Sequence, residues 1–146
     1  MGMGNPLMGD EGVGWAVARS LEAHPRLPLD VYVAWGGTDL LATSSLLDGR
    51  LRVVLLQAVD GEEPCSLVPL DPDGYGLDEG ATGDHAESLR DTLALLRMLS
   101  PGVDRLEVRI LGITVPRVRA RADLSTTLRE HLSDLAERVL VELDRA

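Results

Sequence analysis

Two adjacent acids, Asp10 and Glu11, lie in a glycine-rich opening segment that reads GMGNPLMGDEGVG. Both stand where a helix is predicted to begin, and a carboxylate there caps the helix and complements its dipole. One acid suffices for that role, so we expect Asp10 to cap the helix and Glu11, about 100° further round it, to face the adjacent crevice as a ligand. The glycines, with Gly4 and Asn5 in the loop, would let a substrate approach the backbone. The alternative is structural: both acids serve the helix start, and the glycines serve a tight turn.

His85 is the histidine whose position suits a ligand. It follows a loop rich in glycine and aspartate at 71–83 and opens a helix-like segment, so its ring can face the ends of strands. His24 and His131 occupy polar helical positions and are expected on the surface. A lone histidine is more often structural than functional, and that alternative stays open for His85.

Several familiar catalytic patterns are absent from the sequence. It has no H-E-x-x-H motif, no cysteine-rich zinc spacing and no G-x-S-x-G serine motif. All 14 basic residues are arginine, which excludes a phosphate-loop lysine and a Schiff-base lysine. The opening glycines Gly2, Gly4 and Gly9 do not fit G-x-G-x-x-G, so a nucleotide-binding protein is the least favoured hypothesis.

The chain is acidic, with a formal net charge of −10, and this argues against a nucleic-acid partner. Arginines alternate with small or apolar residues at 117–121, which is typical of a solvated strand end or loop. The single cysteine, Cys65, cannot form an internal disulfide and is expected to be a buried thiol. No apolar run approaches the length of a membrane span and no secretory signal opens the chain, so a cytoplasmic protein is expected.

Strand-like and helix-like segments alternate along the chain, which predicts a single α/β domain over 1–146 with a mainly parallel sheet. The predicted strands are 29–35, a fully buried run at 51–59, an edge strand at 65–71 that contains Pro69, and 105–113. The predicted helices are 10–23, a short helix to Leu47 capped by Thr38, a long helix capped by Asp84, and a final helix capped by Ser125.

Ligands of such sheets bind outside the carboxyl ends of the strands. Three segments follow strand-like positions: the opening glycine loop, Gly36 to Thr38, and the stretch that begins at Gln57. The opening loop needs a strand before it, yet only Met1 precedes Gly2. We therefore expect the first strand to be missing or truncated in this sequence, or to begin upstream of Met1.

The pattern G-x-G-N-x-x-x-x-D-E-G at 2–12, followed by GGT at 36–38, QAVDG at 57–61 and DHAESLRDTLALL at 84–96, resembles the hydrogenase maturation proteases. The resemblance covers nearly the whole chain. It implies a three-layer α/β/α sandwich with about five strands. It also implies an endopeptidase that trims the C-terminus of a nickel-loaded hydrogenase large-subunit precursor, with the nickel carried by that partner and no cofactor of its own.

The resemblance also implies which side chains contact the metal. The family's acid and histidine fall on Glu11 and His85, which are then the catalytic and metal-contacting residues, and a divalent ion is expected to bind them. Gln57 stands at the position of the family's aspartate. Its amide oxygen is an uncharged, poorer donor for Ni²⁺ and cannot take up a proton. Asp60, three residues further along, would point to the opposite face of a continuing strand.

A second departure concerns the loop of Gly36, Gly37 and Thr38, because Trp35 stands where many relatives have an acid. The favoured hypothesis is therefore an endopeptidase with a weakened third contact at Gln57. The alternative is a catalytically degenerate binding or chaperone-like module of the same fold, which holds the precursor without cutting it. The sequence leaves the oligomeric state open.

Overall fold

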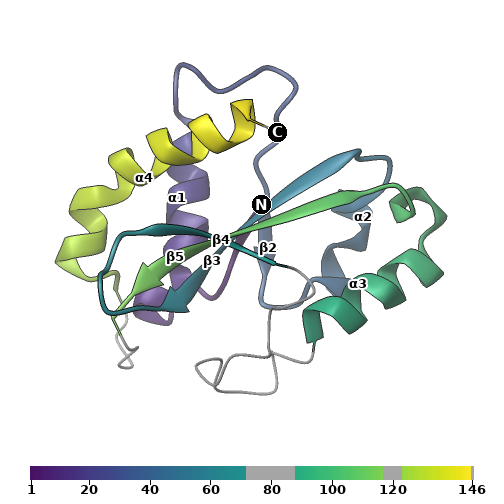
Figure 1. Cartoon of the computed structure of the whole chain (residues 1–146), viewed down its shortest axis with the longest axis horizontal. Helices are drawn as coiled ribbons and strands as arrows, with labels where there is room; N and C mark the ends of the chain where they lie inside the picture. Colours follow the sequence, from purple (N-terminus) through teal and green to yellow (C-terminus); the bar gives the residue numbers. More distant parts are fainter. Residues whose placement is uncertain (72–87, 117–122, 146) are drawn as a thin grey trace.

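The computed structural model describes residues 1–71, 88–116 and 123–145 (Figure 1). Its elements, with η for short 3₁₀ helices, are β1 (Gly2–Met3), η1 (Gly9–Gly12), α1 (Val13–Glu22), β2 (Trp35–Gly37), η2 (Leu41–Thr43), α2 (Ser44–Leu47), β3 (Arg52–Asp60), β4 (Leu67–Leu70), α3 (Ser88–Leu99), η3 (Pro101–Val103), β5 (Glu107–Val115) and α4 (Thr126–Asp144). None of the described helices is both long and apolar enough to cross a lipid bilayer.

Five strands form one mixed sheet in the order β2-β1-β3-β5-β4. The first four strands of this order pair in parallel, and β3 and β5 share a continuous ladder from Arg52 and Glu107 to Asp60 and Val115. Only β4 runs antiparallel, at the edge, and Pro69 lies within it. The predicted α/β fold with a mostly parallel sheet of about five strands is confirmed.

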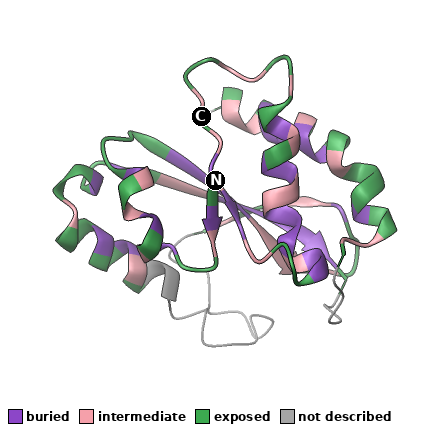
Figure 2. Ribbon diagram, turned by 180° about the vertical axis from the view of Figure 1, so that it is seen from behind, coloured by how far each residue is buried: buried purple, intermediate pink, exposed green. Residues whose placement is uncertain are grey.

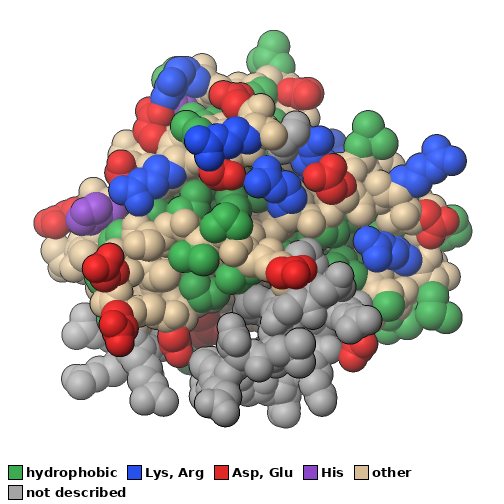
Figure 3. Space-filling model, viewed as in Figure 1, with side chains coloured by type: hydrophobic (Ala, Val, Ile, Leu, Met, Phe, Trp, Pro, Cys, Tyr) green, Lys and Arg blue, Asp and Glu red, His purple; other side chains and the backbone are tan. Residues whose placement is uncertain are grey.

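Helices cover both faces of the sheet, α1 and α4 on one side and α2 and α3 on the other (Figure 1). Because side chains alternate along a strand, Val54 and Leu56 of β3 pack with α1 and α4, whereas Val53 and Leu55 pack toward α2 and α3. The inward surfaces of the helices are buried and their outer surfaces exposed (Figure 2). On the face drawn in Figure 3, acidic and arginine side chains are intermixed over the described part.

Helix α1 lies directly against the sheet because Gly14 has no side chain. A β-carbon at this position would overlap the carbonyl oxygen of Leu56 in β3 and would lie 2.7 Å from that of Met3 in β1. Backbone atoms of two strands cannot yield as the end of a flexible side chain can. This contact therefore fixes the distance of α1 from the centre of the sheet.

The acid predicted to cap the first helix has a different role. Helix α1 begins at Val13, after η1, and no side chain caps either element. Asp10 is buried, and its Oδ1 accepts a hydrogen bond of 2.6 Å from the amide of Ser125, directly before α4. The prediction of an Asp10 cap is wrong, because the carboxylate accepts from the distant amide of Ser125 rather than from an amide of its own helix.

Other boundaries agree with the sequence in part. Ser125 caps α4 as predicted, since its hydroxyl accepts from the amide of Leu128. Thr38 does not cap a helix; the Asp39 carboxylate instead accepts from the amide of Leu41. The strand predicted over 29–35 is reduced to β2, and the predicted cap Asp84 lies outside the described residues.

Replacing Gly14 with alanine tests the contact between α1 and the sheet. Because the new methyl group must displace backbone, we expect Gly14→Ala to lower the free energy of unfolding by about 3 kcal/mol. Gly49→Ala is the matched control, since Gly49 has φ +70° but open space around it, and about 1 kcal/mol is expected there. Urea denaturation compares the two, and equal unfolding midpoints would contradict this account.

The Asp10 hydrogen bond is tested by two substitutions at one position. Asp10→Ala leaves the Ser125 amide without its acceptor and should cost about 2 kcal/mol of unfolding free energy. Asp10→Asn keeps an acceptor oxygen and should cost clearly less. If urea denaturation gives the alanine and asparagine variants the same free energy of unfolding, the hydrogen bond from Ser125 does not stabilise the fold.

Candidate functional site

The opening loop, the loop at 36–38 and Gln57 meet at the carboxyl edge of the sheet. The register pairs Gly2 with Leu56 of β3 and Met3 with Gly37 of β2, so β1 and β2 end beside Gln57, whereas β3 continues to Asp60. The Gly4 amide donates to the Gly37 carbonyl over 2.8 Å, and the Trp35 indole donates to the Gly4 carbonyl over 3.3 Å. The three segments that the sequence placed at this edge therefore lie together there.

Glu11 lies in η1 at this edge and is half-buried. Among residues 1–71, 88–116 and 123–145, no hydrogen bond or ion pair engages its carboxylate, which is left available to a ligand. Its backbone has a defined place, because a β-carbon on Gly4 would overlap the Glu11 carbonyl oxygen and Gly4 has φ +104°. The sequence predicts that a substrate approaches the backbone at Gly4. In the structure, the backbone of Glu11 lies against Gly4.

Gln57 lies on β3 with its side chain on the same face as Val53 and Leu55, which is the face covered by α3. Its side-chain nitrogen, Nε2, is buried and has no hydrogen-bond partner within the described structure. A buried donor without an acceptor costs about 1–3 kcal/mol. The amide is therefore an unfilled donor beside the carboxyl edge.

Asp60 does not compensate for the missing aspartate. Strand β3 continues through Asp60, so this side chain points to the face opposite to that of Gln57, and it is exposed.

The loop residues Asn5 and Thr38 differ in their contacts. Asn5 Oδ1 accepts a hydrogen bond from the Leu7 amide over 2.9 Å, whereas Thr38 is exposed in a turn. The acids of η1 are Glu11 and Asp10, and Asp10 is already bonded to the Ser125 amide.

The histidines differ in what the structure says of them. His85 lies outside the described residues, three positions before α3 begins at Ser88. The C-terminal end of α3 leads through η3 to the start of β5, at the amino edge of the sheet. The N-terminal end of α3 is therefore directed toward the carboxyl edge (Figure 1). His131 is exposed, as expected. His24 is not a surface side chain: it is largely buried, with Nε2 3.0 Å from Glu137.

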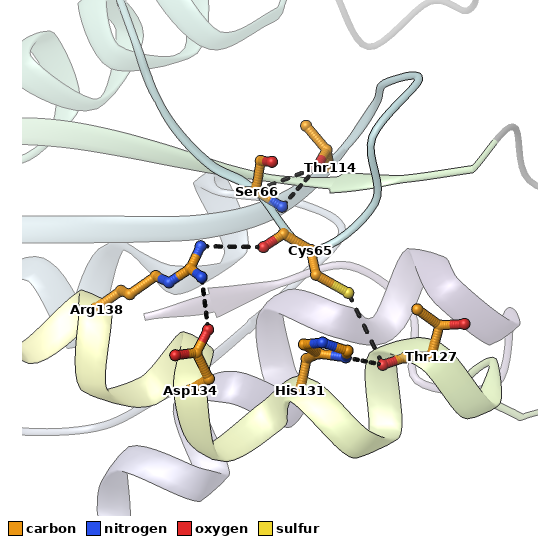
Figure 4. Close-up of polar contacts among 7 residues, drawn as sticks. All are labelled: Cys65, Ser66, Thr114, Thr127, His131, Asp134 and Arg138. Atoms are coloured by element: carbon orange, nitrogen blue, oxygen red, sulfur yellow. Dashed lines mark hydrogen bonds and ion pairs between the residues drawn. The ribbon is translucent and has the colours of Figure 1, made fainter.

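The connection from β3 to β4 is fastened to β5 by Thr114. This buried hydroxyl donates to the Glu63 carbonyl over 2.6 Å. It also accepts from the Ser66 amide over 2.8 Å (Figure 4). Cys65, between them, has φ 65° and donates its amide to the Thr114 carbonyl. Thr114 could not be singled out from the sequence, because a threonine inside a strand is ordinary and its hydrogen-bond partners come from a different segment.

Helix α4 holds the other side of the same connection. Arg138 donates to the Cys65 carbonyl over 3.4 Å and pairs with Asp134 at 2.8 Å, and both Cys65 Sγ and His131 Nδ1 lie against the Thr127 carbonyl (Figure 4). Burial raises the pKa of the Cys65 thiol, and the nearby Arg138 opposes this only in part. The thiol stays protonated at neutral pH and is structural, as the sequence predicted.

A resident metal centre is not assembled by the described side chains alone. No group of three or more His, Cys, Asp or Glu residues suited to a metal ion occurs among them. Glu11 is available and Gln57 is uncharged, so a second strong donor would have to come from a residue such as His85 or from the substrate.

No protein-family model matches the chain, and no curated protein is significantly similar to it. Solved structures do match. The hydrogenase maturating endopeptidase HybD from E. coli has 22% identity and a TM-score of 0.75, with 99% of this chain and 90% of that chain covered.

Two archaeal structures agree with this match. The NiFe hydrogenase maturation protease HybD from Thermococcus kodakarensis has 23% identity and a TM-score of 0.73, with 94% of this chain and 93% of that chain covered. The hydrogenase 2 maturation peptidase from a Thaumarchaeota archaeon has 27% identity and a TM-score of 0.61, with coverages of 97% and 94%. The chain therefore has the α/β fold of the hydrogenase maturation endopeptidases, the family that its motifs resemble.

Proposed function

We propose that the protein is an endopeptidase that removes a C-terminal peptide from a nickel-loaded hydrogenase large-subunit precursor. The observation that carries the proposal is the meeting of the Glu11 loop, the 36–38 loop and Gln57 at one sheet edge, in a fold shared with named endopeptidases. The partner, which the resemblance implies, and the cytoplasmic location, which was expected from the sequence, remain predictions.

The chemistry assigned to the site uses metal that belongs to the substrate. Carboxylate and imidazole are suitable donors for Ni²⁺, and we assign these roles to Glu11, whose carboxylate has no partner in the described structure, and to His85. Their task is to orient the nickel-bearing end of the precursor at the sheet edge, where water cleaves one peptide bond. A divalent ion without precursor is expected to bind the same two side chains.

Gln57 favours a specific alternative, a binding module that holds the precursor without cutting it. An amide cannot accept the proton that a general base takes from water. Its buried, unpartnered Nε2 is instead suited to donate a hydrogen bond to a carbonyl of a bound peptide. The two functions share the partner and the docking edge, and they differ in whether a peptide bond is broken.

The endopeptidase hypothesis predicts that trimming depends on Glu11. Co-expression with a nickel-loaded precursor, followed by mass spectrometry of the precursor, should show loss of a C-terminal peptide with the wild type. Glu11→Gln should reduce trimming at least tenfold, because it removes the charge offered to the metal. Glu22→Gln, at an exposed acid that ends α1, is the matched control and should trim normally. Wild-type trimming by Glu11→Gln would contradict the role of Glu11, and a precursor that neither binds nor is trimmed would overturn both functions.

Gln57 predicts opposite effects on stability and on function. Gln57→Leu removes a buried unpaired donor and should raise the free energy of unfolding by about 1 kcal/mol, measured by urea denaturation, while weakening capture of the precursor. Gln57→Asp restores a carboxylate; if the wild type binds without trimming and this variant trims, the degenerate module is the correct function. A leucine variant that is less stable than the wild type would show that the amide is satisfied in solution.

A further inference from the structure

Two segments without charged side chains meet at the carboxyl edge of the sheet. Residues 2–9 read GMGNPLMG and residues 33–38 read VAWGGT, whereas 26% of the whole chain is charged. Three large apolar side chains of these two segments are nevertheless exposed to solvent: Leu7, Met8 and Trp35 are 78%, 42% and 50% exposed. Large apolar side chains that stay exposed beside a candidate site are a recurring mark of a binding surface.

The Trp35 indole is held in one orientation although half of the residue is exposed. Its N–H donates to the Gly4 carbonyl over 3.3 Å. Its ring also packs on that of Trp15 in α1, with 6.2 Å between the ring centroids and 36° between the ring planes. An aromatic ring fixed in this way offers an apolar face to a ligand, and little side-chain entropy is lost when the ligand binds.

The space beside this indole is open. Gly37 follows Trp35 by two residues and has φ +63°, and a β-carbon added to it would have no described atom within 4 Å. Thr38, the next residue, is exposed. Gly4 on the neighbouring loop is different, because a β-carbon there would overlap the Glu11 carbonyl oxygen. A ligand can therefore approach the 36–38 loop, whereas the protein's own backbone fills the space at Gly4.

The other two exposed side chains are joined directly to the candidate ligand Glu11. Asn5 shapes their loop, since its Oδ1 accepts from the Leu7 amide over 2.9 Å and its carbonyl accepts from the Met8 amide over 3.0 Å. The Met8 carbonyl in turn accepts from the Glu11 amide over 3.4 Å. A peptide segment that contacts Leu7 and Met8 would thus lie next to Glu11.

We propose that Trp35 is a specificity-determining residue, whose indole forms, with Leu7 and Met8, a subsite for an apolar side chain of the precursor's C-terminal segment. The inference rests on the proposed function and adds the chemistry of the segment that is recognised. An apolar side chain leaves water when it packs on these groups. An acidic one would be repelled by Glu11 and by the net charge of −10.

A cationic side chain is the competing occupant, because the face of an indole also attracts cations. The exposed Leu7 and Met8 favour the apolar one, since aliphatic side chains offer a cation no attraction. The two occupants are separated by experiment.

The first test measures the subsite without the precursor. Trp15 and Trp35 are the two tryptophans of the chain, so Trp15→Phe leaves Trp35 as the sole fluorescent indole. The capped peptide Ala-Leu-Leu-Ala, at millimolar concentration, should shift its emission to shorter wavelength, because the ring loses contact with water. Ala-Ser-Ser-Ala and Ala-Lys-Lys-Ala should not, and Trp35→Phe, which retains Trp15, is the control. No shift with the leucine peptide, or an equal shift with the lysine peptide, overturns the subsite.

The second test uses the nickel-loaded precursor. Trp35→Ser should raise KM for trimming about tenfold and leave kcat nearly unchanged, because it removes binding that substrate and transition state share. Trp35→Phe keeps an apolar face and should trim as the wild type does. An unchanged KM in Trp35→Ser overturns the subsite and leaves the endopeptidase in place. A precursor that the wild type does not trim, together with the shift by the leucine peptide, retains the subsite and rejects the endopeptidase.

Gly37→Asn provides the test if Trp35→Ser does not fold. It keeps the indole and places a side chain in the open space beside it, and asparagine is among the residues that tolerate a positive φ. Gly49→Asn is the matched control, because Gly49 has φ +70° and open space but precedes β3 at the amino edge. Capture of the precursor should weaken about fivefold in the Gly37 variant alone, and equal capture by the two variants overturns the subsite.

Discussion

The close contact of α1 with the middle of the sheet determines the geometry of the carboxyl edge. Because Gly14 brings the helix against the backbones of Met3 and Leu56, η1 and Glu11 cannot be displaced outward without separating helix and sheet. Gly4 imposes a second constraint, since its backbone lies against Glu11 and in a conformation that favours glycine. The glycines of the opening segment thus position the candidate ligand by allowing the chain to pack on itself.

The alternation of one buried strand then decides which side chains can share a site. Gln57 faces the layer that contains α3, whereas Asp60 faces the other layer. A carboxylate only three positions away therefore cannot take the place of the acid that the resemblance implies at position 57. Among the described residues, this edge offers the available carboxylate of Glu11 and the unfilled amide donor of Gln57, so an experiment must distinguish binding from cleavage.

Much of the fold could be predicted from the sequence, because local patterns specify it. The buried run of β3, the edge strand with Pro69 and the Ser125 cap depend on periodicity and on residues near in sequence. Asp10 could not be assigned in this way, since the amide that it binds is 115 residues away. The shortening of β2 has a similar cause, because a strand forms only where its neighbour exists. For the site, the segments could be predicted, but the unfilled donor of Gln57 is visible only once burial is known.

The buried amino terminus has a chemical consequence, because the sequence contains no lysine. The amino group of Met1 lies inside the sheet, where it donates to the Val54 carbonyl. Acylating reagents such as activated esters reach this amine only when the strands around it part. The rate of such labelling reports how often the centre of this sheet opens.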